Sequence, residues 1–341
     1  MKYLFFIADI QDIWLFSYLF TRLNSFKIVY KKSGKVTSPH HYIKFFEQIS
    51  SDVFRFTGLD DEKFIKEVDN CDYFITKECL PFVEDGPYSK KIIGISWVGE
   101  TIAKTHDLSS ARPPNPKKIV YGCENFYIEK QLKEFYDYLK FKTKPTSPKY
   151  YFLNNSSRED ICKILGLDSK KKYFTIFSNP NVNLDKRVLK IFDHIRELGS
   201  SLGYECIIKN KMKYGDYLRN SIDHSFFFDG SPILYHPGIM LQSVSEFSIG
   251  FATSASVESE AIGSRFISFW RHEIEDRDTI FNSIFEIGNG YRWAQSENTF
   301  NICTTSTLES IVNELDKFIR KSKCRDFSNK FEEDSFLQSL E

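Results

Sequence analysis

The residues from Phe247 to His272 carry the strongest chemical signal in this chain of 341 residues. An apolar run ends at Phe251, small residues fill Ala252–Ser256, a short helical pattern follows as far as Gly263, and a second apolar run covers Phe266–Trp270. This order predicts a strand, a tight turn, a helix with a glycine stop, and a second strand. Free backbone N–H groups and the positive end of the dipole at such a helix start suit a phosphate or diphosphate.

A purely structural corner is the alternative interpretation of this segment. Every α/β protein has strand–turn–helix corners, and Ser and Thr are favoured helix caps for local reasons. Glu258 and Glu260 add to the chemical interpretation, because carboxylates in the first turns of the helix could accept hydrogen bonds from the hydroxyls of a sugar.

Composition and charge limit the class of protein. Lys and Arg together number 46, as do Asp and Glu, so the net charge is zero and broad nucleic-acid binding is not expected. The seven cysteines are scattered without a CxxC pair, which is typical of free thiols in a cytoplasmic protein. Asp9 and Asp12 interrupt the apolar N-terminus, so a buried first strand is expected there rather than a signal peptide or a spanning helix.

Short apolar runs alternate with amphipathic ones along the whole chain, which predicts parallel sheets covered by helices on both faces. The polar, proline-bearing stretch Lys142–Lys149 divides two such sets. We therefore expect an α/β protein with two Rossmann-like domains, residues 1–145 and 150–325, followed by a tail at 326–341. If the two parallel sheets face each other, a cleft for a small molecule lies between them.

This arrangement resembles the GT-B glycosyltransferases and their relatives. The pattern Thr253-Ser254-Ala255-Ser256, with Glu260-Ala261 and Gly263 after it, is similar to the turn and helix shared by non-hydrolysing UDP-N-acetylglucosamine 2-epimerases and CDP-glycerol glycerophosphotransferases. The resemblance covers about 50 residues of the second domain, and the first domain matches in architecture only. Two features depart from it: Ala255 and Ser256 replace the usual glycines, and the Lys-Pro-His-Pro type of segment is absent.

By this resemblance, a donor site in the second domain would hold the diphosphate and ribose of a nucleotide-activated donor, without a metal or a separate cofactor. Lysines and an arginine at strand ends would add positive charge to this site, and a histidine in the Tyr-His-Pro-Gly loop would add a further contact. The alternatives are that the lysines are solvated, that the arginine forms a local ion pair and that the histidine is structural. The expected donor-site residues are Thr253, Ser254, Ser256, Glu260, Lys209, Lys211, His236 and Arg271.

A catalytic base for sugar transfer should come from strand ends of the first domain. Glu100 follows the strand expected at Ile92–Trp97 and is the first choice, with Asp9 and His106 after it. Asp9 also precedes a helix, which would suit a capping role.

The function expected from these features is transfer of a sugar from a nucleotide-sugar donor to a glycan or lipid-linked acceptor, as in the biosynthesis of a surface polysaccharide or glycolipid. The alternatives are a CDP-glycerol-type glycerophosphotransferase, a nucleotide-sugar 2-epimerase and a non-catalytic relative that binds a nucleotide or glycan. A basic helix end at Phe318–Lys323 would suit peripheral contact with the inner face of a membrane, although the helix macrodipole alone accounts for basic residues there.

Overall fold

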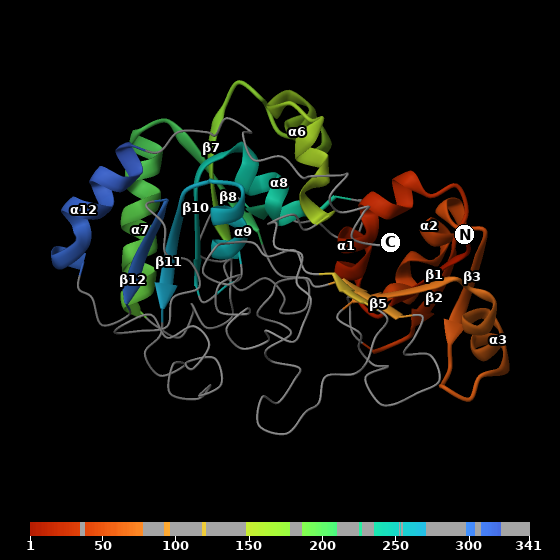
Figure 1. Ribbon diagram of the computed structural model, residues 1–341. Coiled ribbons are helices and arrows are strands. Elements are labelled where there is room, and N and C mark those ends of the chain that lie inside the picture. Colours follow the sequence, from red (N-terminus) through yellow and green to blue (C-terminus); the bar gives the residue numbers. More distant parts are fainter. Residues whose placement is uncertain are drawn as a thin grey trace. The chain divides into compact units, whose positions relative to one another are not determined.

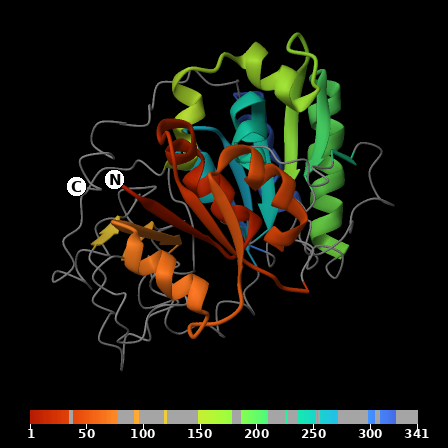
Figure 2. The same cartoon turned by 90° about the vertical axis from the view of Figure 1, so that its right-hand side faces the viewer.

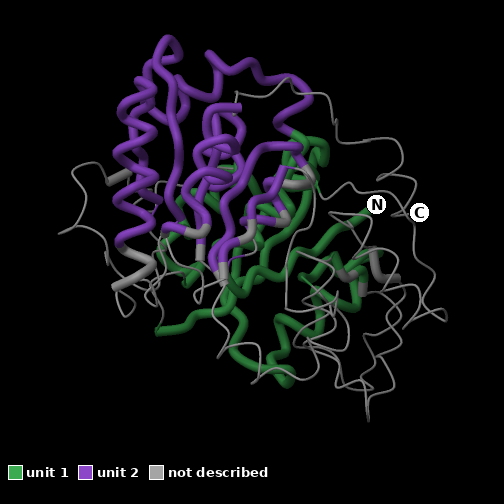
Figure 3. Tube along the Cα trace, turned by 90° about the vertical axis from the view of Figure 1, so that its left-hand side faces the viewer, with its two compact units in different colours: residues 1–151, 232–236, 331–341 green, residues 152–231, 237–330 purple. Residues whose placement is uncertain are grey.

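The computed structural model describes residues 1–34, 38–77, 92–95, 118–120, 148–177, 186–209, 225–226, 235–251, 253, 255–270, 298–303 and 308–321. The described chain divides into two compact units (Figure 3). Unit 1 is built from the described parts of Met1–Tyr151 together with Tyr235 and His236, and unit 2 from the described parts of Phe152–Ser231 and Pro237–Lys330.

Unit 1 is a six-stranded parallel sheet in the order β3-β2-β1-β4-β5-β6. Its strands are β1 (Tyr3–Ile7), β2 (Lys27–Lys31), β3 (Asp52–Phe56), β4 (Tyr73–Lys77), β5 (Ile92–Ile95) and β6 (Lys118–Val120). Its helices are α1 (Ile10–Arg22), the 3-10 turn η1 (Pro39–Tyr42), α2 (Ile43–Ile49) and α3 (Glu62–Asn70).

Strand alternation gives the sheet of unit 1 two buried faces. On β1, Phe5 and Ile7 pack into the cluster that includes α1 and α2, whereas Leu4 and Phe6 pack into the cluster that includes α3. The helix α3 is the orange helix of Figure 2. Its Phe64 is completely buried against the second face. Successive side chains of a strand point to opposite faces, so a strand covered on both sides is apolar throughout.

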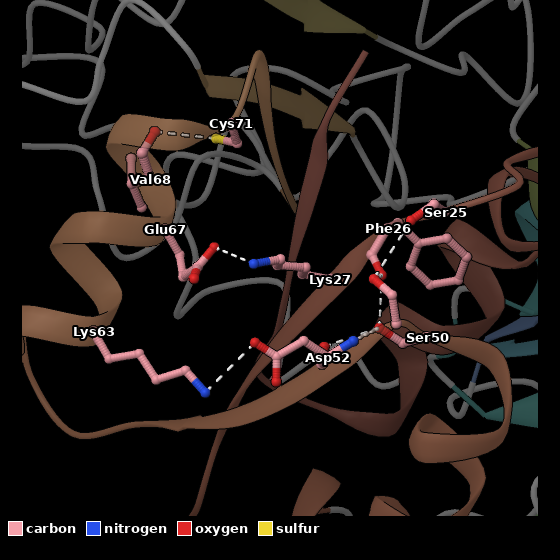
Figure 4. Close-up of polar contacts among 10 residues, drawn as sticks. Ser25, Phe26, Lys27, Ser50, Asp52, Lys63, Glu67, Val68 and Cys71 are labelled. Atoms are coloured by element: carbon pink, nitrogen blue, oxygen red, sulfur yellow. Dashed lines mark hydrogen bonds and ion pairs between the residues drawn. The ribbon is translucent and has the colours of Figure 1, made fainter.

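Polar contacts hold the outer part of unit 1 together at the amino ends of β2 and of the edge strand β3 (Figure 4). Lys27 Nζ of β2 lies 2.7 Å from Glu67 Oε2 of α3, and Lys63 Nζ of α3 lies 3.5 Å from Asp52 Oδ2 of β3. The Ser50 hydroxyl donates a hydrogen bond of 2.8 Å to the Phe26 carbonyl. These contacts fix α3 and the edge strand β3 to β2.

Unit 2 repeats the same strand order, as β12-β11-β10-β7-β8-β9, and is also parallel throughout. Its strands are β7 (Lys172–Phe177), β8 (Tyr204–Lys209), β9 (Ser225–Phe226), β10 (Ser245–Phe251), β11 (Phe266–Trp270) and β12 (Thr299–Cys303). Its helices are α6 (Arg158–Leu165), α7 (Lys186–Ser201), α8 (Pro237–Val244), α9 (Ala255–Ala261) and α12 (Leu308–Arg320), and the 3-10 helix η3 (Pro148–Asn154) spans the division between the units.

The two faces of the sheet in unit 2 differ in chemistry. Helices α7 and α12 lie side by side over one face and bury an apolar cluster that includes Phe174, Phe247 and Phe269 (Figure 1). Helices α8 and α9 pack near the other face, where the strands contribute smaller polar side chains such as Thr175 and Ser248, both fully buried. Every residue of α8 is buried.

The helices begin and end where local chemistry predicts. Asp9 caps α1 in a capping box with Asp12, and Ser157 caps α6 in a second box with Asp160. Among the described helices none is long and apolar enough to cross a membrane. The strands β3 and β12 and the helix α6 were not expected from the sequence, and each strand lies at an edge of its sheet.

Candidate functional site

The topology of unit 2 identifies one place on its sheet where a ligand is expected. Strand β7 pairs with β8 on one side and with β10 on the other, so the chain changes direction along the sheet between β7 and β10. In open α/β sheets, ligands bind outside the carboxyl ends of the strands at such a switch point. The turn predicted as an anion site follows β10 directly, so it lies at this switch point (Figure 1).

The turn after β10 is organised by Thr253. Its hydroxyl oxygen accepts a hydrogen bond of 3.3 Å from the Ala255 N–H, and its carbonyl accepts from the Ser256 N–H at 3.2 Å and from the Ser256 hydroxyl at 3.0 Å. Thr253 is 4% exposed and Ser256 is fully buried. In this conformation both side chains serve to shape the turn.

Gly250 permits the close packing of this turn on the sheet. A Cβ atom at Gly250 would lie 2.4 Å from Thr253 Cγ2 and 2.9 Å from Phe266 Cζ, both far inside van der Waals contact. Thr253 therefore folds back over β10 because that position carries no side chain.

Hydrogen bonds from and to Gln242 of α8 hold the start of α9 and the turn after it. The Gln242 side-chain amide donates a hydrogen bond of 2.6 Å to the Ala255 carbonyl, and the Ser264 hydroxyl donates one of 3.0 Å to the Gln242 carbonyl. Gln242 is completely buried. This role could not be predicted from the sequence, because a lone Gln in an apolar helix has no local signature of such hydrogen bonds.

The predicted glycine stop is confirmed. Gly263 has φ 62°, and the Ser264 N–H donates to the Ser259 carbonyl at 2.8 Å. This is the Schellman pattern, in which a left-handed residue reverses the chain and its successor satisfies a free carbonyl of the last turn. The helix thus has seven residues and leads immediately into β11.

Lys209 ends β8, next to the carboxyl end of β7, and is half-buried there. Its Nζ lies 6.0 Å from the centre of the Phe177 ring, at the end of β7. Burial lowers the pKa of Lys209, and the negative charge of Glu258 in α9 acts in the opposite direction. Glu258 is 3% exposed. The charge of Glu258 therefore acts on Lys209 at this edge of the sheet.

The other expected donor-site residues have different outcomes. Glu260 belongs to the last turn of α9, and its side chain is not described. His236 belongs to unit 1, is 8% exposed, and its ring lies 4.8 Å from the Trp14 ring in an edge-to-face contact. Ser254, Lys211 and Arg271, like the candidate bases Glu100 and His106, lie outside the described residues.

Unit 1 has an equivalent switch point between β1 and β4. Asp9, the remaining candidate base, follows β1 there, and its side chain accepts a hydrogen bond of 3.2 Å from the Gln11 N–H. Asp12 Oδ2 accepts from the Ala8 N–H at 2.7 Å and from the Asp9 N–H at 3.0 Å. Two carboxylates therefore meet at this edge of the sheet.

Asp12 is 1% exposed, and burial raises its pKa from 3.8 to about 6. The charge of Lys77 at the end of β4 and the two backbone hydrogen bonds act against this rise, whereas the charge of Asp9 adds to it. From the sequence alone Asp12 is only an interruption of an apolar run, because its partner Lys77 is 65 positions away. Within the described residues, no group of His, Cys, Asp and Glu side chains could hold a metal ion.

Comparison with known proteins confirms the fold. No family model matches the chain, and no curated protein is similar to it in sequence. The structure of UDP-GlcNAc 2-epimerase from Methanocaldococcus jannaschii matches 100% of this chain and 98% of its own, with a TM-score of 0.53 and 12% identity. A putative UDP-N-acetylglucosamine 2-epimerase from Listeria monocytogenes matches 99% of this chain and 94% of its own, with a TM-score of 0.50 and 10% identity.

A glycosyl transferase family 9 protein from Veillonella parvula also matches, over 99% of this chain and 96% of its own, with a TM-score of 0.41 and 10% identity. The two epimerase structures, together with the strand order of both sheets, show that the chain has the GT-B fold of two Rossmann-like units with parallel sheets, as the sequence resemblance predicted. At these identities the likeness establishes the fold alone.

Proposed function

We propose that the protein is a metal-independent glycosyltransferase that moves a sugar from a nucleotide-activated donor to a glycan or lipid-linked acceptor. The observation that carries the proposal is the position of the β10–α9 turn at the switch point of unit 2, in a chain with the GT-B fold. The M. jannaschii epimerase of the same fold has been crystallised with UDP-GlcNAc and UDP, which supports a nucleotide sugar as the donor class.

In this proposal unit 2 binds the donor. Lys209 faces the diphosphate as a cation, and Glu260 accepts hydrogen bonds from the ribose hydroxyls, with Ser254, Lys211 and Arg271 completing the site. Thr253 and Ser256 shape the turn rather than contact the ligand with their side chains, because Ser256 is buried and donates to Thr253.

Unit 1 supplies the base that removes the proton of the acceptor hydroxyl as the sugar is transferred. Asp9 is the candidate whose place the structure describes, at the carboxyl edge where acceptor chemistry is expected. Asp12 lies behind it and holds the β1–α1 turn, so we assign Asp12 a positioning role. Glu100 and His106 remain candidates for the same proton transfer.

The test has a binding step and a turnover step. Nucleotides UDP, CDP, GDP, ADP and CMP are added to the full chain, and the melting temperature is compared between wild type, Glu260→Ala and the control Glu309→Ala, an exposed carboxylate of α12. A nucleotide at 100 times its Kd stabilises the folded state by about 2.7 kcal/mol. We expect one nucleotide to stabilise wild type and Glu309→Ala but not Glu260→Ala.

The turnover step separates a transferase from an epimerase. The activated sugar of the stabilising nucleotide is incubated with the protein, with and without an acceptor glycan, and followed by NMR. A transferase consumes donor in the presence of acceptor, whereas a 2-epimerase forms a new donor sugar without acceptor. Stabilisation by no nucleotide would overturn the donor assignment, and tight binding without turnover would favour a non-catalytic relative.

A further inference from the structure

A second, positively charged group of side chains lies at the carboxyl edge of unit 1, apart from Asp9 and Asp12. Lys32 follows β2, Arg55 lies on the edge strand β3, and His40 and His41 form the turn η1. Lys32, Arg55 and His41 are exposed, and His40 is half-exposed. We call these four residues the basic edge cluster.

The two histidines are held together closely. Their ring centres lie 3.8 Å apart with an angle of 39° between the planes. His40 Nδ1 lies 2.8 Å from the Ser38 hydroxyl oxygen, which also accepts a hydrogen bond of 2.9 Å from the Ser33 N–H. Ser38 is 1% exposed, so this anchor is part of the core. With Nδ1 bound to Ser38, Nε2 is the nitrogen of His40 that can serve a ligand.

Among the described residues, the charged groups that act on this cluster are basic. Partial burial lowers the pKa of His40, and the charges that lower it further belong to His41, Lys32 and Arg55. Every charged group that shifts this pKa is therefore basic. In the part of the chain that the structure describes, no ion pair joins Lys32, His41 or Arg55 to a carboxylate. An anion bound to such a group would favour the charged form of both histidines.

We propose that the basic edge cluster binds a phosphate group carried by the acceptor substrate. Arg55 offers two parallel N–H donors to phosphate oxygens, Lys32 a point charge, and the imidazoles two further donors. Strand β2 lies between β3 and β1, so β2, which Lys32 follows, and β3, which carries Arg55, are one and two strand spacings, about 5 and 10 Å, from β1, which Asp9 follows. A phosphate bound there places the sugar attached to it beside the candidate base.

The assignment of this phosphate to the acceptor rests on the proposed function, whereas phosphate binding itself does not. The source can be a soluble sugar phosphate or a phosphate at the head of a lipid carrier. Both present anionic phosphate oxygens to the cluster, so the experiment uses one probe of each kind.

The test measures the pKa values of His40 and His41 by NMR of the imidazole C–H groups in the full chain at constant ionic strength, with assignments from His40→Gln and His41→Gln. Glucose 1-phosphate is the soluble probe, glucose its uncharged control, and dodecyl phosphate in phosphatidylcholine vesicles the lipid probe. We expect a phosphate probe to raise the pKa of His40 by about one, with saturation, and glucose to have no effect.

The variant Arg55→Gln distinguishes an anion-binding site from a merely structural group, because it should change the pKa of His40 in one direction without phosphate and reduce the effect of phosphate on that pKa. Without phosphate, loss of a neighbouring cation raises the pKa of His40. With phosphate, loss of an anion ligand reduces the further rise several-fold. Lys170→Gln, an exposed lysine of unit 2, should behave as wild type in both respects.

The outcomes are separable from those of the nucleotide experiment. A response to the lipid probe alone identifies a lipid-linked phosphate, and a response to both identifies phosphate of either source; each supports the site. No rise with either probe, or an equal rise in Arg55→Gln, overturns it. If phosphate raises these pKa values but no nucleotide stabilises the protein, the proposed function fails while the site stands.

Discussion

Lys77 Nζ lies 3.9 Å from Asp12 Oδ1, and this contact joins the end of β4 to the first turn of α1 at the switch point of unit 1. The other carboxylate oxygen of Asp12 accepts hydrogen bonds from the Ala8 and Asp9 N–H groups. Oδ1 has no hydrogen-bond partner among the described residues, so the buried carboxylate is held mainly through its other oxygen. Its removal from water outweighs these contacts, since burial still raises the pKa of Asp12 to about 6.

The first prediction concerns stability against pH. Because the folded-state pKa of Asp12 lies above the unfolded value of 3.8, the folded protein binds a proton between pH 3.8 and about 6 that the unfolded chain releases. The contribution of Asp12 to stability is therefore fully present below this window, and it decreases as pH rises through it. This difference in pKa between the folded and unfolded states corresponds to a change of ~3 kcal/mol in the free energy of unfolding. Urea unfolding from pH 4 to 7 measures the slope.

Two variants separate Asp12 from other titrating groups in that experiment. Asp12→Asn keeps an acceptor for the Ala8 and Asp9 N–H groups but carries no charge, so it should lose this component of the slope. Lys77→Met removes a charge that lowers the pKa of Asp12, so the window should extend to higher pH. An Asp12→Asn profile parallel to that of wild type would exclude Asp12 as the source.

The second prediction concerns the close approach of Gly250 and Thr253. Gly250→Ala places a methyl group 2.4 Å from Thr253 Cγ2 and 2.9 Å from Phe266 Cζ, and should lower the free energy of unfolding by about 1–3 kcal/mol. Thr253→Ser removes Cγ2 but keeps the hydroxyl that accepts from the Ala255 N–H. The double variant should therefore recover part of the lost free energy of unfolding. Recovery should be incomplete because the new methyl group still lies too close to Phe266.

Gly34→Ala is the matched control for this cycle. A Cβ at Gly34 has no neighbour within 4 Å, so this variant should remain within about 0.5 kcal/mol of wild type. Strict additivity of Gly250→Ala and Thr253→Ser would show that the two residues do not interact as the structure indicates.

The third prediction concerns the end of α9. Gly263 has φ 62°, a conformation that costs a residue with a Cβ about 1 kcal/mol. Gly263→Ala should lower stability by about that amount, and Gly263→Asn by less, because Asn tolerates the left-handed region. Thermal unfolding of both variants checks the order, and an equal loss in the two would contradict the conformational explanation.

Local patterns explain what could be predicted from the sequence. The β10–α9–β11 unit was expected because strand, turn residues, helix and Gly263 follow one another within a single stretch of chain. The edge strands β3 and β12 were missed for a physical reason. Each has five residues and mixes polar with apolar side chains, and its strand conformation comes from pairing with a neighbour, as in Tyr30 with Arg55 and Trp270 with Cys303.

The site was harder to predict than the fold, because its contacts join distant parts of the chain. His236 was expected beside the donor helix from its position just before α8, but its ring packs on Trp14, which is more than 200 positions earlier. Asp12 and Lys77 likewise meet only after the parallel sheet brings β1 and β4 together. Sequence spacing alone could not predict these partners.

The fourth prediction concerns Lys209 and Glu258. Lys209→Met removes a positive charge that acts on a carboxylate only 3% exposed, so the variant should be destabilised although methionine is easier to bury than lysine. Glu258→Gln in the same protein should restore stability, with a coupling free energy of about 1 kcal/mol in the double-mutant cycle.

Donor binding should respond differently to the same variants. If Lys209 faces the donor diphosphate, its loss weakens binding about tenfold, and Glu258→Gln does not restore it because the missing cation is still missing. Lys209→Arg keeps the charge and should retain most of the affinity. Calorimetric titration of the stabilising nucleotide into the folded double variant Lys209→Met/Glu258→Gln therefore distinguishes a lysine that binds the ligand from one that only balances the charge of Glu258. Wild-type affinity in the double variant would leave Lys209 with the structural role.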